Sequence, residues 1–207
     1  MGVLLTLHPV NPEVRSLKRA ADVVRAGGVI VYPTDSCYAL GCALGNKPAM
    51  ERIAALRDVD KHHHFTLVCR DLSEIARYAR VENWQYRLLK ACTPGAYTFL
   101  LAATNEVPRR LQNAKRRTIG IRVPDHVVPL QLLAELNEPL MSSTLLLPGD
   151  DYPLTDAAEI HERLGARVDL VLDGGNCGLE PTSVIDLSGS GPLVVREGKG
   201  DISRFSG

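Results

Sequence analysis

The segment "GGVIVYPTDSCYALGC", residues 27–42, constrains the fold of this chain more than any other feature. Its "VIVY" run is too short and too continuously apolar for anything but an inner strand of a sheet. Pro33 fixes its own φ angle and lacks the N–H that a sheet ladder needs, so the chain must leave the sheet there. Thr34, Asp35 and Ser36 then present two hydroxyl groups and a carboxylate at the strand end. The pattern predicts either a ligand-binding turn or a side-chain-capped turn that closes the strand.

Helical and extended patterns alternate along the whole chain. Apolar residues at helical spacing predict a first helix from Asn11–Pro12 to Gly27, and Asp71 with Glu74 has the spacing of a capping box. The other helices are expected at 49–57, 84–91, 128–136 and 157–164, and the other strands at 65–69, 96–102, 118–123, 139–147, 168–173, 182–187 and 193–197. This alternation favours an α/β fold, and the closely spaced strands near the C-terminus make its sheet mixed.

Size and cysteine content narrow the class of protein. The chain has 207 residues, 45% of them hydrophobic, and no Ser/Gly-rich linker, so we expect a single domain over residues 1–207. Its five cysteines form no CxxC pair, and an odd number without a signal sequence predicts reduced thiols and a cytoplasmic location. No stretch approaches the roughly 20 apolar residues that a membrane-spanning helix needs, so no membrane role is expected.

The charges are unevenly distributed although the formal net charge is zero. No acidic residue lies between Glu106 and Asp125, whereas the stretch from Asp150 to Glu162 is mostly acidic. The RNA-binding candidates in the basic segment are Arg109, Arg110, Lys115, Arg116 and Arg117. This segment is either a nucleic-acid-binding face or a solvated charged surface, and the sequence alone leaves both readings open.

Arg122 ends the otherwise apolar strand "TIGIRV". A guanidinium group is costly to bury unless an anion meets it, so Arg122 needs either a bound ligand or a neighbouring carboxylate. Because ligands of open α/β sheets gather at strand ends, we expect Thr34, Arg122 and Thr144 to share one crevice.

Several familiar motifs are missing from the chain. It has no GxSxG, GxxxxGK[ST] or GxGxxG motif, so we assign no catalytic nucleophile and no standard phosphate loop. The "KHHHF" run at 61–65 lacks the spacing of a zinc site, because adjacent histidines point in different directions. We therefore predict no protein-bound metal, and a histidine of this loop either contacts a polar substrate or is solvated.

Six blocks in register carry a resemblance to a known family. They are "YPTDSCYALG", "TPGAYTFLL", "GIRVPDH", "PLMSSTLLLPG", "PTSVIDL" and "VVREGKGD". Together they resemble the YrdC-like family of threonylcarbamoyl-AMP synthases, from about Ala20 to Gly200. Details such as "GGVIVYPTDS" and "FTLVCRDLSE" are closer to the YciO subgroup.

The resemblance implies a twisted mixed sheet with surrounding helices and a central positively charged groove. It implies condensation of L-threonine, bicarbonate and ATP, with Mg²⁺, to threonylcarbamoyl-AMP and pyrophosphate, a step in tRNA modification. It also implies possible partners in tRNA or double-stranded RNA.

The family's binding positions can be placed on this sequence one at a time. Those on the threonine side fall on Thr34, His63, Arg122, Thr182 and Ser183. Those on the nucleotide side fall on Arg57, Thr93, Thr98, Thr144 and Arg196, with Lys61 and Ser142 as further candidates beside Ser143.

Two family blocks are altered on the triphosphate side. The K-x-R block falls on Arg57 and Val59, and the S-x-N block falls on Thr144 and Leu146, so one cation and one amide are lost. Two hypotheses follow: a synthase-type nucleotidyltransferase with reduced activity, or a double-stranded RNA- or tRNA-binding paralogue without efficient adenylation.

Overall fold

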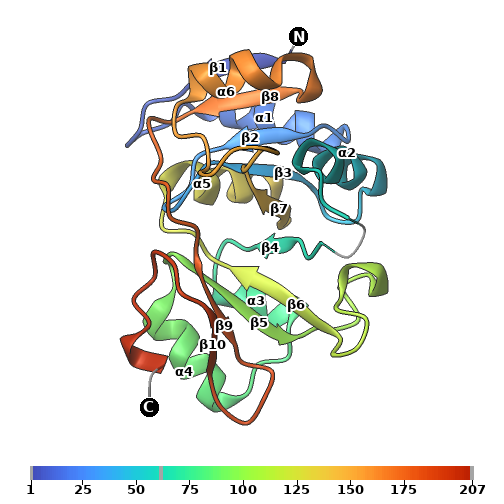
Figure 1. Cartoon of the computed structure of the whole chain (residues 1–207), viewed down its shortest axis with the longest axis vertical. Helices are drawn as coiled ribbons and strands as arrows, with labels where there is room; N and C mark the ends of the chain where they lie inside the picture. The colour runs from blue at the N-terminus through green and yellow to red at the C-terminus, as the bar shows by residue number, and fades with distance from the viewer. Residues whose placement is uncertain (1, 61–62, 206–207) are drawn as a thin grey trace.

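The computed structural model describes residues 2–60 and 63–205 and contains one continuous ten-stranded sheet (Figure 1). The strand order is β1-β8-β2-β3-β7-β4-β6-β5-β9-β10. The strands are β1 (Val3–Thr6), β2 (Ile30–Tyr32), β3 (Ala39–Ala43), β4 (Thr66–Val68), β5 (Tyr97–Ala102), β6 (Thr118–Arg122), β7 (Leu140–Thr144), β8 (Leu170–Asp173), β9 (Ser183–Asp186) and β10 (Leu193–Arg196). Parallel pairing joins β1 to β8, β8 to β2, β4 to β6 and β5 to β9, and the other neighbours are antiparallel. The predicted mixed α/β sheet is confirmed.

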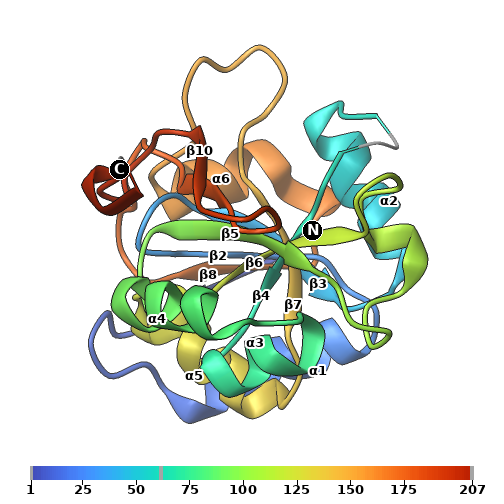
Figure 2. The same ribbon diagram turned by 90° about the horizontal axis from the view of Figure 1, so that it is seen from below.

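Helices pack on both faces of the sheet and bury two apolar clusters. They are α1 (Val14–Arg25), α2 (Lys47–Arg57), α3 (Leu72–Tyr78), α4 (Asn83–Cys92), α5 (Val127–Leu136) and α6 (Ala157–Leu164). The larger cluster joins α2, α3, α4 and α6 to one face, and the smaller one joins α1 and α5 to the other. Figure 2 shows α1 and α5 on the opposite side of β2 and β8 from α2 and α6. No helix among the described residues is long and apolar enough to cross a bilayer.

Two strands were missed by the sequence patterns. β1 lies at an edge of the sheet beside β8, and β3 lies between β2 and β7. The polar turn predicted after Pro33 is short, because the chain returns to the sheet at Ala39. The loop 33–38 therefore connects two adjacent antiparallel strands, and it is tethered at both ends by a buried ladder.

The start of α1 differs from the prediction, and the start of α3 agrees with it. α1 begins at Val14 rather than near Asn11, because Nδ1 of His8 accepts hydrogen bonds from the N–H groups of Val10 and Asn11 and holds that segment in a turn. Asp71 caps α3 as predicted, accepting a hydrogen bond from the N–H of Glu74 at 2.8 Å.

The strand register gathers polar residues on one stretch of the sheet. Ser142 in β7 pairs with Thr66 in β4, and Thr66 pairs with Gly120 in β6. In the next row Leu140 pairs with Val68, and Val68 pairs with Arg122. Paired residues point to the same face, so these rows continue the face that α1 and α5 cover elsewhere. Here that face carries hydroxyl groups and a cation instead of a helix.

Gly41 permits the closest packing at this place. It lies in β3, and a Cβ atom there would stand 2.8 Å from Cε1 of the fully buried Tyr32 ring. The hydroxyl of Tyr32 is hydrogen-bonded to Oγ of Ser142 at 2.7 Å, so the ring has little freedom to move away.

We predict that Gly41→Ala lowers the free energy of unfolding by about 1–3 kcal/mol, because the added methyl group overpacks the Tyr32 ring. Urea denaturation followed by circular dichroism measures this. Gly191→Ala is the matched control, since a Cβ at Gly191 meets nothing within 4 Å. Equal unfolding midpoints for the two variants would contradict the prediction.

Candidate functional site

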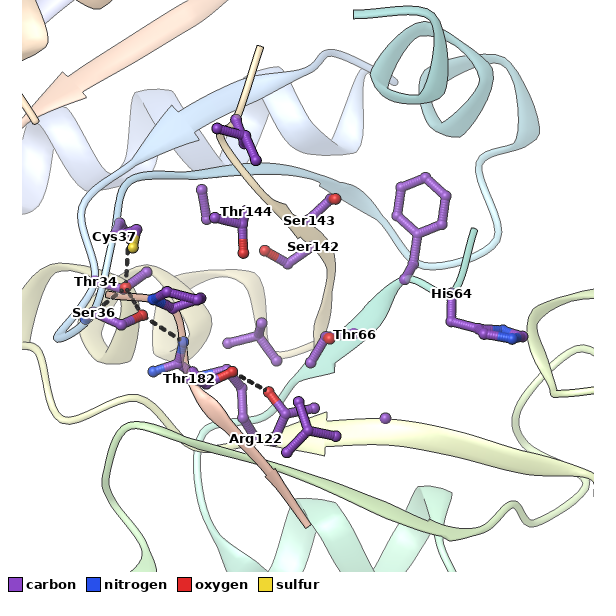
Figure 3. Close-up of a pocket in the computed structure, with 18 of the residues that line it drawn as sticks. Thr34, Ser36, Cys37, His64, Thr66, Arg122, Ser142, Ser143, Thr144 and Thr182 are labelled. Atoms are coloured by element: carbon purple, nitrogen blue, oxygen red, sulfur yellow. Dashed lines mark hydrogen bonds between the residues drawn. The ribbon is translucent and has the colours of Figure 1, made fainter. Parts of the chain in front are cut away.

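A pocket of about 650 Å³ opens at the polar stretch of the sheet. Its walls come from the loop after β2, from β4, β5, β6 and β7, and from the segments that precede β9 and end β10. Figure 3 shows hydroxyl groups from several of these elements around the cavity. The buried serine and threonine residues of the lining are Thr34, Ser36, Thr98, Thr118, Ser142, Ser143 and Thr182. Such a lining offers donors and acceptors to a small polar ligand.

Neighbouring contacts orient several of these hydroxyl groups. Oγ1 of Thr34 donates to the carbonyl of Cys37 at 2.6 Å and accepts from the N–H of Ser36 at 3.1 Å. Oγ1 of Thr98 lies 2.8 Å from Oγ1 of Thr182, which joins β5 to the segment before β9. The loop after β2 thus has the local side-chain-capped turn that the sequence allowed, and the same side chains line the pocket.

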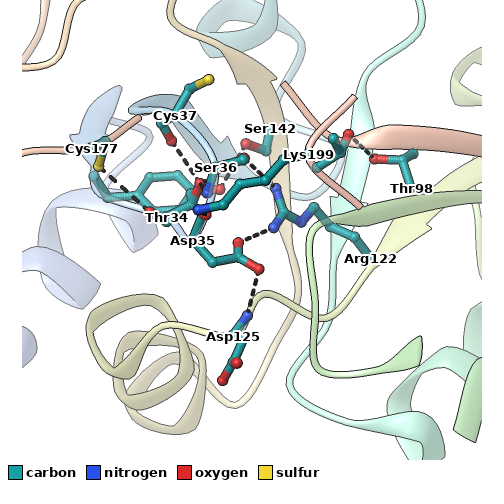
Figure 4. Close-up of polar contacts among 12 residues, drawn as sticks. Thr34, Asp35, Ser36, Cys37, Thr98, Arg122, Asp125, Ser142, Cys177 and Lys199 are labelled. Atoms are coloured by element: carbon teal, nitrogen blue, oxygen red, sulfur yellow. Dashed lines mark hydrogen bonds and ion pairs between the residues drawn. The ribbon is translucent and has the colours of Figure 1, made fainter. Parts of the chain in front are cut away.

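Arg122 forms a buried ion pair with Asp35, and only 8% and 11% of the two side chains are exposed (Figure 4). The carboxylate of Asp35 also accepts from the N–H of Asp125 at 3.0 Å, and Nη1 of Arg122 donates to Oγ of Ser36 at 3.3 Å. Of the two alternatives for Arg122, the structure therefore shows the neighbouring carboxylate. Nε of Arg122 is buried without a hydrogen-bond partner in the described part of the chain, and the residue still lines the pocket.

Asp35 is also tied to the end of the chain. Nζ of Lys199 donates a hydrogen bond to the carbonyl oxygen of Asp35. The loop after β2, the end of β6 and the segment after β10 thus meet around one carboxylate-bearing residue.

Two further guanidinium groups line the pocket, those of Arg57 and Arg196. Within residues 2–60 and 63–205 neither forms an ion pair with a carboxylate. Arg57 instead donates to Oγ of Ser143, and Arg196 donates to the carbonyl of Thr182 at 2.8 Å. Burial lowers the pKa of both groups, and the charge of Arg196 lowers that of Arg57 further. An arginine stays protonated in proteins, so the pocket has two cations that a bound anion would stabilise.

His63 lies beside this cationic wall as a neutral imidazole. Its Nε2 accepts a hydrogen bond from Arg57 at 3.0 Å and lies 3.0 Å from Oγ of Ser143. Burial, with the charge of Arg57 as the second cause, lowers the pKa of His63 to about 4. His63 is therefore uncharged at neutral pH and orients Arg57 without adding a third positive charge.

The structure brings together most of the residues that the resemblance placed in the site. The pocket lining includes Thr34, Arg57, His63, Thr98, Arg122, Ser142, Thr144, Thr182 and Arg196. Thr34, Arg122 and Thr144 line the same pocket, as expected from their positions at strand ends.

Two expected positions lie elsewhere. Thr93 donates its hydroxyl to the carbonyl of Leu89 at 2.7 Å, and Ser183 donates to the carbonyl of Gly200 at 2.6 Å. Neither lines the pocket: the hydroxyl of Thr93 caps the end of α4, and the hydroxyl of Ser183 joins the start of β9 to the segment after β10. The ligand-binding roles expected for these two residues remain predictions. Lys61 lies outside the described residues.

The altered triphosphate-side positions differ in their structural effect. Leu146 lines the pocket, and its carbonyl oxygen accepts a hydrogen bond from Nε of Arg57 at 3.5 Å. Val59 does not line the pocket, and its N–H donates to the carbonyl of Ala54 at 3.1 Å. Of the two altered positions, only Leu146 therefore places an alkyl side chain in the lining of the cavity.

The cations of the basic segment lie outside the pocket, on the 3-10 turn Arg109–Leu111 and the loop that follows it, although Leu111 and Asn113 of the same segment line the pocket. Its five cations, Arg109, Arg110, Lys115, Arg116 and Arg117, are all exposed. Arg116 is paired with the buried Asp186, and Arg110 donates to the carbonyl of Gly45. Two of the five cations therefore make contacts with other parts of the protein.

Neither a disulfide nor a cluster of metal ligands is present among the described residues. All five cysteines are free, and burial raises the pKa of Cys37 and that of Cys177 to about 11. Among the described residues no three His, Cys, Asp or Glu side chains gather as a metal site.

Several residues of the pocket were not predicted from the sequence. Thr66, Thr118 and Gly120 line it, and the alternation in "TIGIR" was the available signal. A Cβ at Gly120 would lie 3.3 Å from Thr98, so this glycine leaves room at the pocket floor. Asp35 was noted as a turn carboxylate, but its partner 87 positions away became visible only in the fold.

These features define a class of protein: a mixed α/β chain with a hydroxyl- and arginine-lined pocket over its central strands. The family model named Sua5, YciO and YrdC, described as "Telomere recombination", matches residues 22–198. The chain belongs to this family.

Known relatives lie at different distances from the chain. The crystal structure of E. coli YciO is 51% identical, with a TM-score of 0.95 over 99% of this chain and 100% of that one. A threonylcarbamoyl-AMP synthase of Halorhodospira halophila is 31% identical over 82% of this chain and 89% of the relative. The crystal structure of P. abyssi Sua5 complexed with L-threonine shares the fold, with 23% identity and a TM-score of 0.86 over 95% of this chain and 57% of that one.

We predict that Asp35→Ala lowers the free energy of unfolding by about 3–5 kcal/mol, because it leaves the Arg122 charge buried and unpaired. Chemical denaturation measures the loss. The double variant Asp35→Ala/Arg122→Met should lose much less than the sum of the two single variants, since it removes both charges. Simple additivity of the two losses would show that the pair does not couple.

Proposed function

We propose that this protein is a nucleotidyltransferase of the threonylcarbamoyl-AMP synthase type. It would join L-threonine, bicarbonate and ATP into threonylcarbamoyl-AMP with release of pyrophosphate. The observation that carries this proposal is the placement of Arg57 and Arg196, two cations without carboxylate partners in the described chain, beside buried hydroxyl groups in one pocket.

The reaction needs positive charge at that place. The carbamate formed from threonine and bicarbonate is an anion, and its oxygen attacks the α-phosphorus of ATP while the bond to the β-phosphate oxygen breaks. Two negative groups must therefore approach each other before the new bond forms. The guanidinium groups of Arg57 and Arg196 offset this repulsion, and they are oriented beforehand by Ser143 and Thr182.

The hydroxyl-lined part of the pocket suits the amino acid. Thr34, Ser142 and Thr182 are buried there and offer donors and acceptors to the carboxylate, amine and hydroxyl of threonine. The synthase from H. halophila supports the reaction type by its name, and the P. abyssi Sua5 structure with L-threonine supports an amino acid ligand on this fold.

Mg²⁺ would enter with ATP. Magnesium at such sites keeps several waters and uses the substrate phosphates with only one or two protein ligands. The pocket suits this mode, because Asp151 and Glu180 are the carboxylates of its lining and do not form a cage with further ligands among the described residues. When bound, the ion would neutralise phosphate charge.

Loss of the family amide at Leu146 and of one cation at Val59 predicts a slow enzyme. A single such group contributes about 2–4 kcal/mol to the transition state, which corresponds to about 30- to 1,000-fold in rate. We expect the lost amide at position 146 to reduce the rate more than the lost cation at position 59, since Leu146 lines the pocket and Val59 does not.

We predict that the protein releases pyrophosphate from ATP only when L-threonine and bicarbonate are both present. Arg57→Ala and Arg196→Ala should each lower kcat by about 100-fold, because each removes one cation from the transition state. Arg87→Ala, an exposed arginine on α4, is the matched control and should leave the rate unchanged. A pyrophosphate-release assay measures all four proteins, and Leu146→Asn with Val59→Arg should raise the rate of a decayed synthase. Pyrophosphate release that does not depend on threonine would contradict the proposed reaction.

Binding of double-stranded RNA or tRNA is a second candidate function. It is favoured by Arg109 and Lys115, which are exposed and have no ion-pair partner in the described chain. Arg116 is a poor probe of RNA binding, since its guanidinium also holds Asp186.

If RNA binds, Arg109→Ala/Lys115→Ala should weaken binding and make the slope of log K against log salt shallower by about one to two units. Lys18→Ala/Arg19→Ala removes the same charges from the exposed face of α1 and serves as the control. A filter-binding titration at several salt concentrations decides the matter. Identical slopes for the two double variants would exclude the basic segment as the RNA-binding face.

A further inference from the structure

One serine of the pocket lining is held from the inside of the sheet by two groups of the protein. Oγ of Ser142 lies 2.7 Å from the hydroxyl of Tyr32 and donates a hydrogen bond to the carbonyl oxygen of Leu40 at 3.1 Å. Tyr32 is fully buried and Ser142 is 5% exposed, so both contacts are shielded from water. Ser142 nevertheless lines the cavity, as Figure 3 shows. Its hydroxyl group therefore joins the interior of the sheet to the pocket.

The two inner contacts fix the position of the Ser142 proton. A serine hydroxyl has one proton and two lone pairs. With its proton on the Leu40 carbonyl, Ser142 accepts the proton of Tyr32, and all three groups are satisfied. Burial raises the pKa of Tyr32 to about 12, so Tyr32 keeps this proton at neutral pH. The reverse direction would leave the Tyr32 proton buried without an acceptor among the described residues, which is costly.

Ser142 therefore presents only a lone pair to the pocket. In either direction of its contact with Tyr32, the serine proton stays on the inner side, on Leu40 or on Tyr32. Turning that proton outward would set a lone pair of Ser142 against the Leu40 carbonyl oxygen at 3.1 Å, so a ligand atom that needs a donor finds none here. A ligand N–H, in contrast, finds an acceptor that is already oriented.

A second set of hydroxyl groups in the same pocket has the opposite character. Oγ1 of Thr98 and Oγ1 of Thr182 lie 2.8 Å apart, and both residues line the cavity. Only one of their two protons can lie in this shared contact, so the pair has a second proton to donate. The pocket thus has an acceptor at Ser142 and a donor at the Thr98–Thr182 pair. An amino acid matches this polarity with its amine at Ser142 and a carboxylate oxygen at the threonine pair.

We propose that Ser142 is the acceptor for the amine of the amino acid substrate, and that Tyr32 is a positioning residue that keeps Ser142 in this polarity. The inference rests on the proposed function and deepens it. It assigns the selection of an amine to one oriented oxygen atom, and it explains why a fully buried tyrosine hydroxyl stands behind the pocket.

The polarity of Ser142 matters for the first chemical step. Once the ammonium group of the amino acid has lost a proton to water, its nitrogen has two N–H bonds and one lone pair. That lone pair forms the N–C bond to the carbon of bicarbonate, the C–OH bond of bicarbonate breaks, and hydroxide leaves as water with one proton from the nitrogen. A hydroxyl donor would occupy the lone pair, whereas an acceptor binds an N–H and leaves the lone pair available to attack.

The test compares L-threonine with (R)-3-hydroxybutanoate, which has hydrogen in place of the amine. Isothermal titration calorimetry gives Kd for both ligands, and we expect the full chain to bind L-threonine at least about 10-fold more tightly. Tyr32→Phe/Ser142→Ala should lower this ratio about 10-fold by weakening threonine alone, with the hydroxybutanoate Kd within about 2-fold of its original value. The double variant removes both inner partners, so no buried hydroxyl is left unpaired.

The single variant Tyr32→Phe tests the positioning role. It should lower the ratio about 3-fold, because Ser142 loses the donor that polarises it. Tyr78→Phe is the matched control: it removes the hydroxyl of another buried tyrosine, one that does not line the pocket, and should leave both affinities unchanged.

Three results would overturn the inference. Equal weakening of both ligands in the double variant would show a general effect on the pocket. An unchanged ratio in that variant would place the amine elsewhere, and an unchanged ratio in Tyr32→Phe would reject Tyr32 as a positioning residue. Any of these results together with threonine-dependent pyrophosphate release would leave the proposed function standing. Amine-selective loss in a protein that releases no pyrophosphate would support the role of Ser142 and reject the synthase activity.

Discussion

The arrangement of the pocket depends on the buried ion pair between Asp35 and Arg122. Asp35 belongs to the loop after β2 and Arg122 ends β6, so the pair joins the two halves of the ten-stranded sheet at the place where the cavity opens. Ser36 and Asp125 add hydrogen bonds to it, and Lys199 ties the segment after β10 to the same loop. Loss of the Asp35 carboxylate would leave the guanidinium of Arg122 buried and unpaired, which a fold of marginal stability tolerates poorly.

Pairing within the protein also separates the arginines by role. The charge of Arg122 is compensated by Asp35, whereas the partners of Arg57 and Arg196 among the described residues are neutral: hydroxyl and carbonyl oxygens and, for Arg57, Nε2 of His63. Cations solvated by neutral dipoles keep most of their field for an incoming anion, and a cation already paired with a carboxylate does not. Of the three arginines that the family resemblance placed in the site, Arg57 and Arg196 are thus the two whose charge is available to a bound anion. Neutral His63 completes this wall as an acceptor.

Local patterns predicted most of the elements but not all of the site. The helices and eight of the strands follow from apolar periodicity and from caps such as Asp71, which act within a few residues. β1 and β3 were missed because Val3–Thr6 is short and Ala39–Ala43 is rich in small residues, so neither has a strong strand pattern. Thr93 and Ser183 lie outside the pocket lining, because a hydroxyl that donates to a carbonyl of the protein looks, in sequence, like one that faces a ligand.

By itself, the sequence determined the α/β alternation, the polar turn that follows Pro33 and the need of Arg122 for a partner, because these follow from local sterics and from the cost of burying charge. Only the tertiary structure decided which partner Arg122 takes and which arginines of the pocket have no carboxylate partner among the described residues. Those outcomes depend on strand order and register between residues up to about 160 positions apart, as in the contact of Lys199 with Asp35. Such pairings arise when separate strands are brought side by side, and no local pattern records them.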